Sequence, residues 1–140
     1  MIKGLKLLEK HVKQSVIDLL QFLENKRNLY HFKSQVIKGQ LLDQRTRKTR
    51  WFSTGRPGLQ DCTICYKYVN GGEKFGLYVG FEFKRSKGGI RSDEQKETQA
   101  FINSLGGYYF FIDDYIKADE AFQLIDQDMR NKIARIKNGG

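Results

Sequence analysis

The segment from residue 61 to residue 84 constrains the fold of this chain most strongly. It contains two apolar runs with strand-like composition, Asp61–Val69 and Phe75–Lys84, and Asn70-Gly71-Gly72 between them is a strong turn signal. The segment therefore predicts a β-hairpin. The centre of its second run, Leu77–Phe81, is nearly all apolar, which predicts a strand covered on both faces.

Three charged residues stand where the two predicted strands end side by side. Glu82 and Lys84 are two residues apart, so they share one face of a strand, and Asp61 begins the neighbouring strand. Two carboxylates can hold a hard divalent cation such as Mg²⁺, and an ammonium beside them suits a phosphate. Together they predict metal-assisted phosphodiester cleavage, in which the metal activates water and offsets charge on the phosphate.

Each of the three residues also has an ordinary structural explanation. Asp61 could end the tight turn at Arg56-Pro57-Gly58, and Lys84 could be a solvated lysine at a strand end. Glu82 could face water on an edge strand, but it stands between two phenylalanines, where burial is costly unless a cation compensates the charge. The combination of two acids and a lysine favours a metal site over the separate explanations.

Length and charge limit the class of protein. The 140 residues, 39% of them apolar, suit a single domain spanning residues 1–140 with a real core. The net charge of +9 favours a polyanionic partner such as nucleic acid. No apolar run approaches the roughly 20 residues that cross a bilayer, and the N-terminus does not resemble a signal peptide, so we expect no membrane partner and a cytoplasmic location.

The pair Cys62 and Cys65 forms a C-x-x-C pattern that is typical of zinc and redox sites. Zinc needs further ligands, and the only histidines are His11 and His31, with no second cysteine pair. On a strand, residues three apart face opposite ways. We therefore expect two ordinary reduced cysteines, as in a cytosolic protein.

The remaining periodicity predicts alternating helices and strands. Apolar residues at helical spacing indicate a first helix, and a glycine pair ends a later one. The predicted helices are Leu5–Asn25, Ser92–Leu105 and Ala118–Ile136; two further strands are Leu29–Ile37 and Tyr108–Ile112; polar loops are Lys38–Arg50, expected to be mobile, and Arg85–Arg91. This αβββαβα order predicts an α/β fold, a small mixed β-sheet flanked by helices.

That order, with those residues, resembles the PD-(D/E)xK nuclease superfamily and, more narrowly, the VRR-NUC family in its small stand-alone form of phages and bacteria. The residues that carry the resemblance are Glu9, Gly58-x-x-Asp61, Phe81-Glu82-Phe83-Lys84, Lys87-Gly88-Gly89, Ser92-x-x-Gln95 and Leu105-Gly106-Gly107. Many relatives have proline directly before the first aspartate. Here Gln60 occupies that place and the proline comes earlier, at Pro57.

The resemblance implies a restriction-endonuclease-like fold and a Mg²⁺- or Mn²⁺-dependent DNA endonuclease. Asp61, Glu82 and the backbone carbonyl of Phe83 would bind the metal, and Lys84 would act on the attacking water or the phosphate. Gln95 would stand beside the metal, although Ser92-x-x-Gln95 is equally a capping box. Glu9 would approach a second metal or its water, although most such glutamates lie on a solvated helix face.

Two basic segments are candidates for DNA contact. The first contains Arg45, Arg47, Lys48 and Arg50 and is followed by Trp51; the second, closer to the predicted site, contains Arg85, Lys87 and Arg91. Phosphate contacts of this kind position DNA without reading its sequence. Solvated charged loops are the alternative for both.

The substrate and the assembly are inferred by analogy to stand-alone relatives. A symmetric homodimer would offer two active sites, and two opposed nicks suit a four-way Holliday junction, with a flap or other branched DNA as alternatives. The chief competing hypothesis is a non-catalytic nucleic-acid-binding module that keeps the nuclease fold. A sequence-specific restriction-like enzyme ranks last, because the chain is short for a separate recognition element.

Overall fold

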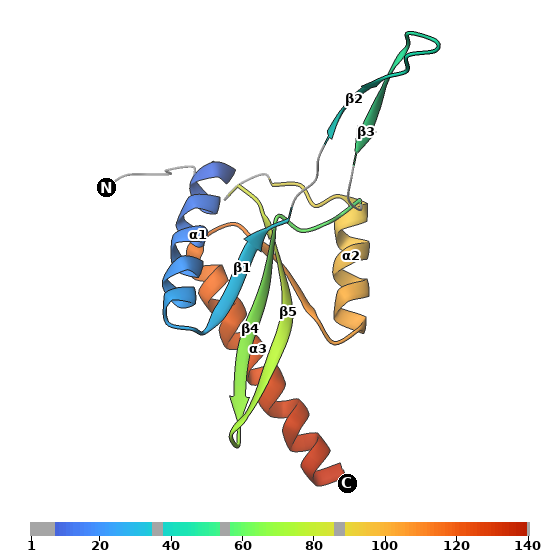
Figure 1. Ribbon diagram of the computed structural model, residues 1–140. Helices are drawn as coiled ribbons and strands as arrows, with labels where there is room; N and C mark the ends of the chain where they lie inside the picture. Colours follow the sequence, from blue (N-terminus) through green and yellow to red (C-terminus); the bar gives the residue numbers. More distant parts are fainter. Residues whose placement is uncertain (1–7, 35–37, 54–56, 86–88, 140) are drawn as a thin grey trace, which may run out of the picture.

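The computed structural model describes residues 8–34, 38–53, 57–85 and 89–139 (Figure 1). These residues form a mixed α/β structure of three helices and six strands. In chain order the elements are α1 (Glu9–Asn25), β1 (Leu29–Lys33), β2 (Lys38–Leu42), β3 (Thr49–Ser53), β4 (Cys62–Asn70), β5 (Glu73–Phe83), α2 (Asp93–Ser104), β6 (Tyr108–Ile112) and α3 (Tyr115–Gly139).

The main sheet has the strand order β1-β4-β5-β6. The first three strands pair antiparallel, and β6 joins β5 in parallel after the α2 crossover. Asn70 pairs with Glu73 across the predicted turn, where both glycines have a positive φ. The predicted α/β class and the small mixed sheet flanked by helices are therefore confirmed.

One face of the sheet carries the core. Helix α1 buries Val12, Val16 and Leu20 against it, and α3 buries Ala118, Ala121, Phe122 and Ile125. The strand residues that point to this face are Ile64, Val79, Phe81, Phe83 and Ile112. The ring of Phe81 lies 5.5 Å from that of Phe122, so β5 and α3 are joined by aromatic packing.

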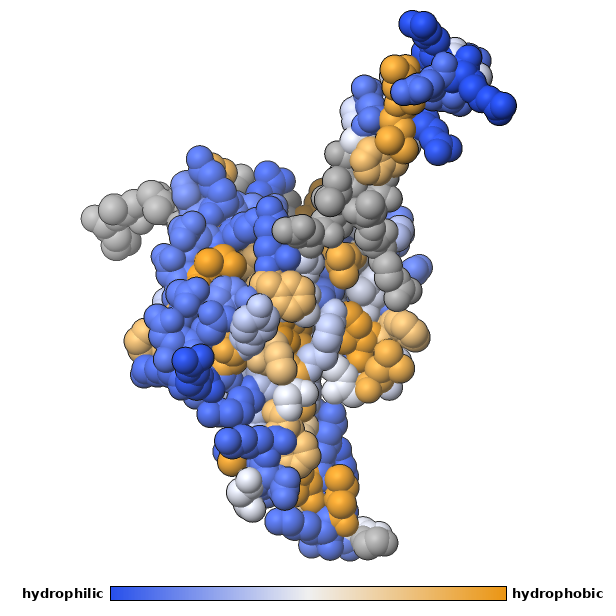
Figure 2. All heavy atoms as spheres, viewed as in Figure 1, coloured by the Kyte–Doolittle hydropathy of each residue, from blue (hydrophilic) through white to orange (hydrophobic). Residues whose placement is uncertain are grey.

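The other face of the sheet is covered over only part of its width. Helix α2 packs on the β6 side, where Gln99 donates to the Tyr109 carbonyl at 3.0 Å. Over β1, β4 and residues 73–78 of β5 this face is open, and Tyr78 is 44% exposed. The prediction that the centre of β5 is covered on both faces is therefore wrong on this side. Figure 2 shows hydrophobic and weakly polar side chains along the middle of this open face, between α1 and α2.

The prediction of a loop at Lys38–Arg50 is wrong, because most of this segment belongs to a second β-hairpin. Strands β2 and β3 pair antiparallel from Lys38 opposite Ser53 to Leu42 opposite Thr49. Figure 1 shows this hairpin projecting away from the main sheet. At its tip, the Asp43 amide donates to the Lys48 carbonyl at 2.9 Å, and the Asp43 carboxylate accepts from the Arg45 amide at 2.9 Å.

The other predicted elements hold, with shifted ends. Helix α3 begins three residues earlier than predicted and ends three later, and β1 stops at Lys33. The predicted start of the first helix at Leu5 and the end of the first strand at Ile37 lie outside the described residues. Among the described residues, no helix is both long and apolar enough to span a bilayer.

Candidate active site

Strand pairing brings the two predicted acids together. Cys62 lies opposite Phe81, so Asp61 and Glu82, the next residues outward, are neighbours across β4 and β5. Both have the parity of the open face. The carboxylate of Asp61 accepts a hydrogen bond from the backbone amide of Phe83 at 2.9 Å, which fixes its position at the strand end.

Glu82 is a buried carboxylate with unequal partners at its two oxygens. The residue is only 6% exposed. Its Oε1 accepts a hydrogen bond from the side-chain amide of Gln95, Nε2, at 2.6 Å and lies 3.7 Å from the Lys84 ammonium. Among the described residues its Oε2 has no hydrogen-bond partner. A buried carboxylate oxygen without a partner is costly, so this oxygen needs a proton or a cation.

The electrostatics of Glu82 agree with this need. Burial and the negative charge of Asp61 raise the pKa of Glu82 from its ordinary value to about 7, although Lys84 acts in the opposite direction. Desolvation disfavours a charged carboxylate, and a second carboxylate nearby disfavours it further. A divalent cation between the two acids would remove both penalties.

Gln95 completes the predicted capping box and also bonds to Glu82, while its predicted place beside a metal stays a prediction. Its Oε1 accepts from the backbone amide of Ser92 at 3.1 Å, and its own backbone amide donates to the Ser92 hydroxyl at 3.1 Å. These two bonds complete the capping box of α2. The Nε2 of Gln95 is then directed to Glu82. The cap of the helix and the orientation of the carboxylate therefore depend on one side chain.

Close packing of α2 on the loop before β4 holds these parts in register. Gly58 has a φ of +79°, and a Cβ there would lie 2.4 Å from the Glu94 carbonyl oxygen. Its own carbonyl accepts from the Tyr109 hydroxyl at 3.2 Å. Burial, with the negative charges of Glu82 and Asp61, raises the pKa of Tyr109, so this hydroxyl stays a donor. A larger residue at Gly58 would push α2, and with it Gln95, away from Glu82.

The residues at this strand end fit a divalent metal ion. The unpartnered Glu82 oxygen and the Asp61 carboxylate provide hard oxygen donors of the kind that Mg²⁺ and Mn²⁺ take. The Phe83 side chain is in the core, so this residue could contribute only its backbone. The part of the chain that the structure describes contains no group of three or more His, Cys, Asp or Glu side chains that could hold a metal, so backbone or water oxygens would complete the shell.

Glu9 lies on α1, a different element from those that carry these residues. It is the first residue of α1, it is exposed, and Figure 1 places the start of α1 at the same end of the sheet as the end of β5. Within the described ranges no hydrogen bond or ion pair joins it to Asp61 or Glu82. Its predicted metal role stays a prediction.

The predicted DNA-contact residues fall into two groups. Arg45, Arg47, Lys48 and Arg50 are all exposed on the projecting hairpin, and Trp51 beside them is 76% exposed. Arg85 is exposed directly after Lys84, and Arg91 stacks with its guanidinium 4.5 Å from the centre of the Phe111 ring. Because Phe111 lies opposite Glu82, Arg91 is close to the carboxylates. Lys87 lies outside the described residues.

The two cysteines are free and lie on opposite faces of the sheet. Cys62 is buried in the core and Cys65 is exposed on the opposite face, so their side chains diverge as predicted. Burial and the nearby Asp61 raise the pKa of Cys62 to about 11, which disfavours the thiolate that a metal or redox site needs.

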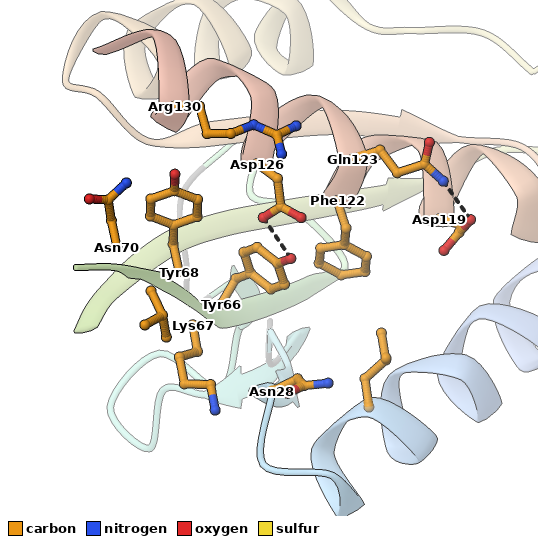
Figure 3. Close-up of a pocket in the computed structure, with 12 residues that line it drawn as sticks. Asn28, Tyr66, Lys67, Tyr68, Asn70, Asp119, Phe122, Gln123, Asp126 and Arg130 are labelled. Carbon is orange, nitrogen blue, oxygen red and sulfur yellow. Dashed lines mark hydrogen bonds between the residues drawn. The ribbon is translucent and has the colours of Figure 1, made fainter. Parts of the chain in front are cut away.

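A hollow of about 620 Å³ lies away from these acids, between α3 and β4 (Figure 3). Tyr66 and Phe122 are among the residues that line it, and the Tyr66 hydroxyl donates to Asp126 at 2.9 Å. Both acids that line it already accept a hydrogen bond, Asp126 from Tyr66 and Asp119 from Gln123 at 3.0 Å. It is therefore a weaker candidate for chemistry than the strand end.

Two contributors to the candidate site were not predicted from the sequence. Gln60 is buried over Gly80, where a Cβ would lie 2.9 Å from its Cγ, and it donates to the Thr63 hydroxyl at 2.8 Å and to the Tyr78 hydroxyl. Tyr109 lies opposite Gly80 on β6, and its hydroxyl donates to the Gly58 carbonyl. For Gln60, the only signal in the sequence was that a polar residue stands directly before Asp61. Nothing in the sequence indicated that Tyr109 belongs to the site.

No protein-family model matches the chain, and searches among curated proteins and solved structures find no match either. The resemblance to the VRR-NUC family therefore remains a prediction carried by the residues themselves.

Proposed function

We propose that this protein is a divalent-metal-dependent DNA endonuclease whose active site is Asp61, Glu82 and Lys84. The observation that carries the proposal is the buried, unpartnered Oε2 of Glu82 beside a second carboxylate. A protein that only binds DNA gains nothing from two acids facing a polyanion, whereas a metal-dependent nuclease requires them.

Each residue has a defined part in the proposed reaction. Mg²⁺ or Mn²⁺, when bound, would activate water and offset charge on the phosphate. Asp61, held by the Phe83 amide, and Glu82, held by Gln95, provide the oxygens for that ion. Lys84, 3.7 Å from Glu82, places a positive charge where the phosphate gains negative charge in the transition state.

The β2–β3 hairpin supplies a means of holding duplex DNA. A two-stranded β-ribbon is narrow enough for the major groove. This one carries Arg45, Arg47, Lys48 and Arg50 on exposed positions, so it would contact phosphates on both sides of a groove. Arg85, Arg91 and Lys87 would contact the strand near the scissile phosphate.

Branched DNA is the proposed substrate, with the Holliday junction first and the flap second. A symmetric homodimer would present two sites to opposed strands of a junction. The dimer part of the proposal is overturned if the protein sediments as a monomer at micromolar concentration, both free and bound to junction DNA.

The decisive experiment is cleavage of labelled four-way junction, flap and linear duplex DNA with Mg²⁺ or Mn²⁺. Wild type is compared with Glu82→Gln, which removes the charge and keeps the shape, and with Glu120→Gln, an exposed acid on α3, as the matched control. We expect metal-dependent cutting that only Glu82→Gln abolishes, with paired symmetric nicks on the junction. Binding without cutting on every substrate would reject the nuclease in favour of the binding module.

A further inference from the structure

The open face of the sheet lies in line with the candidate active site, and the buried Gln60 side chain lies between them over Gly80. Residues two apart along β4 and β5 share this face, so the row that starts with Asp61 and Glu82 leads on to Thr63 and Gly80, and then to Cys65 and Tyr78. On the neighbouring strand, Phe32 lies opposite Thr63 and Tyr30 lies opposite Cys65. Beyond Gln60, the same face therefore leads from the acids to a region where no helix covers the strands (Figure 1).

Exposed aromatic rings occupy the middle of this face. Tyr30 is 63% exposed, Phe32 is 49% exposed, and their ring centres are 6.2 Å apart. Tyr78 on β5 is 44% exposed and is held by the buried Gln60 amide at its hydroxyl. Such large apolar side chains in one patch on a charged protein indicate a binding surface.

Positive charge surrounds the far end of the same face. A hollow of about 520 Å³ there is lined by Tyr30 and Gly76 together with Arg27, Lys67 and Lys74. None of these three cations has an ion-pair partner within the described residues. Glu24 is the acid among the residues that line the hollow, and it accepts a hydrogen bond from the His31 backbone amide at 3.0 Å. Three cations against one carboxylate leave the lining with a net charge of 3 − 1 = +2.

We propose that this open face binds an unpaired DNA strand, with bases stacked on Tyr30, Phe32 and Tyr78 and the backbone running past Lys67 and Lys74 toward Asp61 and Glu82. Aromatic platforms beside cations are the general means of binding single strands without sequence preference, because every base has a π-face. From Asp61 to Val69 the strand spans about 26 Å at ~3.3 Å per residue. That length suits on the order of four nucleotides.

A second copy of the chain is a poorer occupant of this face. A twofold interface places the same patch on both partners, so it would bring Arg27, Lys67 and Lys74 of the two copies together. Charge complementarity therefore favours a polyanion.

This proposal rests on the proposed function, because the bound strand leads to the same acids. It also gives separate partners to the β2–β3 hairpin and to the open face. The hairpin would hold duplex, and the open face would hold the strand that leaves the duplex at a branch. The two functions can be tested independently, because binding is measured without metal and cleavage requires it.

The test is fluorescence anisotropy in EDTA, with Glu82→Gln as the background, a labelled oligothymidylate of about ten nucleotides as the single strand, and a duplex of equal length. We expect Tyr30→Ala with Phe32→Ala to weaken single-strand binding by about tenfold or more and to leave duplex binding within about twofold. The matched control is Phe22→Ala with Tyr115→Ala, which removes two rings that are 54% and 53% exposed on helices.

Two further measurements make the result specific. Photo-crosslinking of an oligonucleotide that contains 5-iododeoxyuridine should label peptides of β1 and of β4 or β5. Replacing Lys67 and Lys74 by Gln should lower the salt dependence of single-strand binding by about 1.4 in log–log slope, at ~0.7 per phosphate contact.

The outcomes that overturn the proposal are equally defined. Equal losses for the aromatic and control variants, or crosslinks confined to the β2–β3 hairpin, would reject the single-strand site. A change from dimer to monomer in the Tyr30→Ala, Phe32→Ala variant, without loss of single-strand affinity, would assign the face to self-association. An absence of cleavage with intact single-strand binding would reject only the proposed function.

Discussion

The carboxylate site and the β2–β3 hairpin are opposite kinds of functional region. At the site, Glu82 is buried and each acid is positioned by a hydrogen bond from another element. The hairpin projects from the main sheet with its cations exposed (Figure 2). Chemistry requires fixed geometry and low solvent access, whereas electrostatic binding needs only charge within reach of phosphates. Mutations should therefore affect the two regions in different ways.

Beyond the loss of cutting in Glu82→Gln, the largest effect is expected at Asp61. Asp61→Asn keeps an acceptor for the Phe83 amide but removes the negative charge, so the fold should persist while the cation site is lost. We expect the cleavage rate to fall by about 10³-fold, the upper range for removing one electrostatic contributor, with DNA affinity unchanged. Single-turnover cleavage and equilibrium binding measure the two quantities. A parallel loss of affinity would show that Asp61 acts in binding.

The next effect concerns the stability of the metal-free protein. The pKa of Glu82 is raised to about 7 in the folded state, above its ordinary value of 4.5, so the folded state holds this proton more tightly than the unfolded state. The stability that this gives is complete below about pH 4.5 and is lost as the pH rises through 7. The loss should be about 3 kcal/mol, at ~1.4 kcal/mol per pKa unit.

Urea unfolding in EDTA at pH 5 and pH 8 measures this effect. Glu82→Gln should lack this part of the pH dependence, so it should be more stable than wild type at pH 8 by an amount that it does not show at pH 5. Mg²⁺ at pH 8 should stabilise wild type and not the variant. The same pH dependence in both proteins would contradict the assignment to Glu82.

A smaller effect is expected from the hairpin, and on affinity alone. Replacing Arg45, Arg47, Lys48 and Arg50 by Gln should weaken duplex binding and reduce its log–log salt slope by about 3.6, at ~0.9 per phosphate contact. The unfolding free energy should change by less than about 0.5 kcal/mol, because these side chains are exposed. Trp51 is the single tryptophan, so its fluorescence reports on the hairpin directly.

The control for the hairpin is an equal charge change elsewhere. Four exposed cations near the C-terminal ends of α1 and α3, at the other end of the sheet from the hairpin (Figure 1), serve for it: Lys26, Arg130, Arg135 and Lys137. If this variant loses as much affinity and slope as the hairpin variant, total charge rather than the hairpin governs binding.

The smallest effect separates the two roles of Gln95. Ser92→Ala removes half of the capping box and should cost about 1 kcal/mol of stability with little change in the cleavage rate. Gln95→Ala removes the cap and the bond to Glu82, so it should show a similar stability loss and about a tenfold slower rate. Thermal unfolding and single-turnover rates, measured on both variants, give the comparison. Equal rates in the two variants would reduce Gln95 to a helix cap.

Local sequence patterns predicted the frame of the fold but missed the projecting hairpin. The hairpin from β4 to β5 was predictable because Asn70-Gly71-Gly72 has strong turn chemistry between two apolar runs. Strands β2 and β3 are only five residues each and flank a charged tip without an Asn-Gly turn. In that hairpin the Phe52 ring packs over Gly39, a pairing that no local pattern reveals.

The sequence by itself determined the order of the three helices and the four main-sheet strands, the pairing of Asp61 with the Glu82–Lys84 strand and the capping box of α2. Each follows from a local signal: apolar periodicity, the Asn70-Gly71-Gly72 turn and the Ser92-x-x-Gln95 spacing. Only the tertiary structure decided that Glu82 is buried with one oxygen unpartnered and that half of a sheet face is open. Burial and desolvation depend on which elements cover a residue, and that is set by packing between segments far apart in the chain.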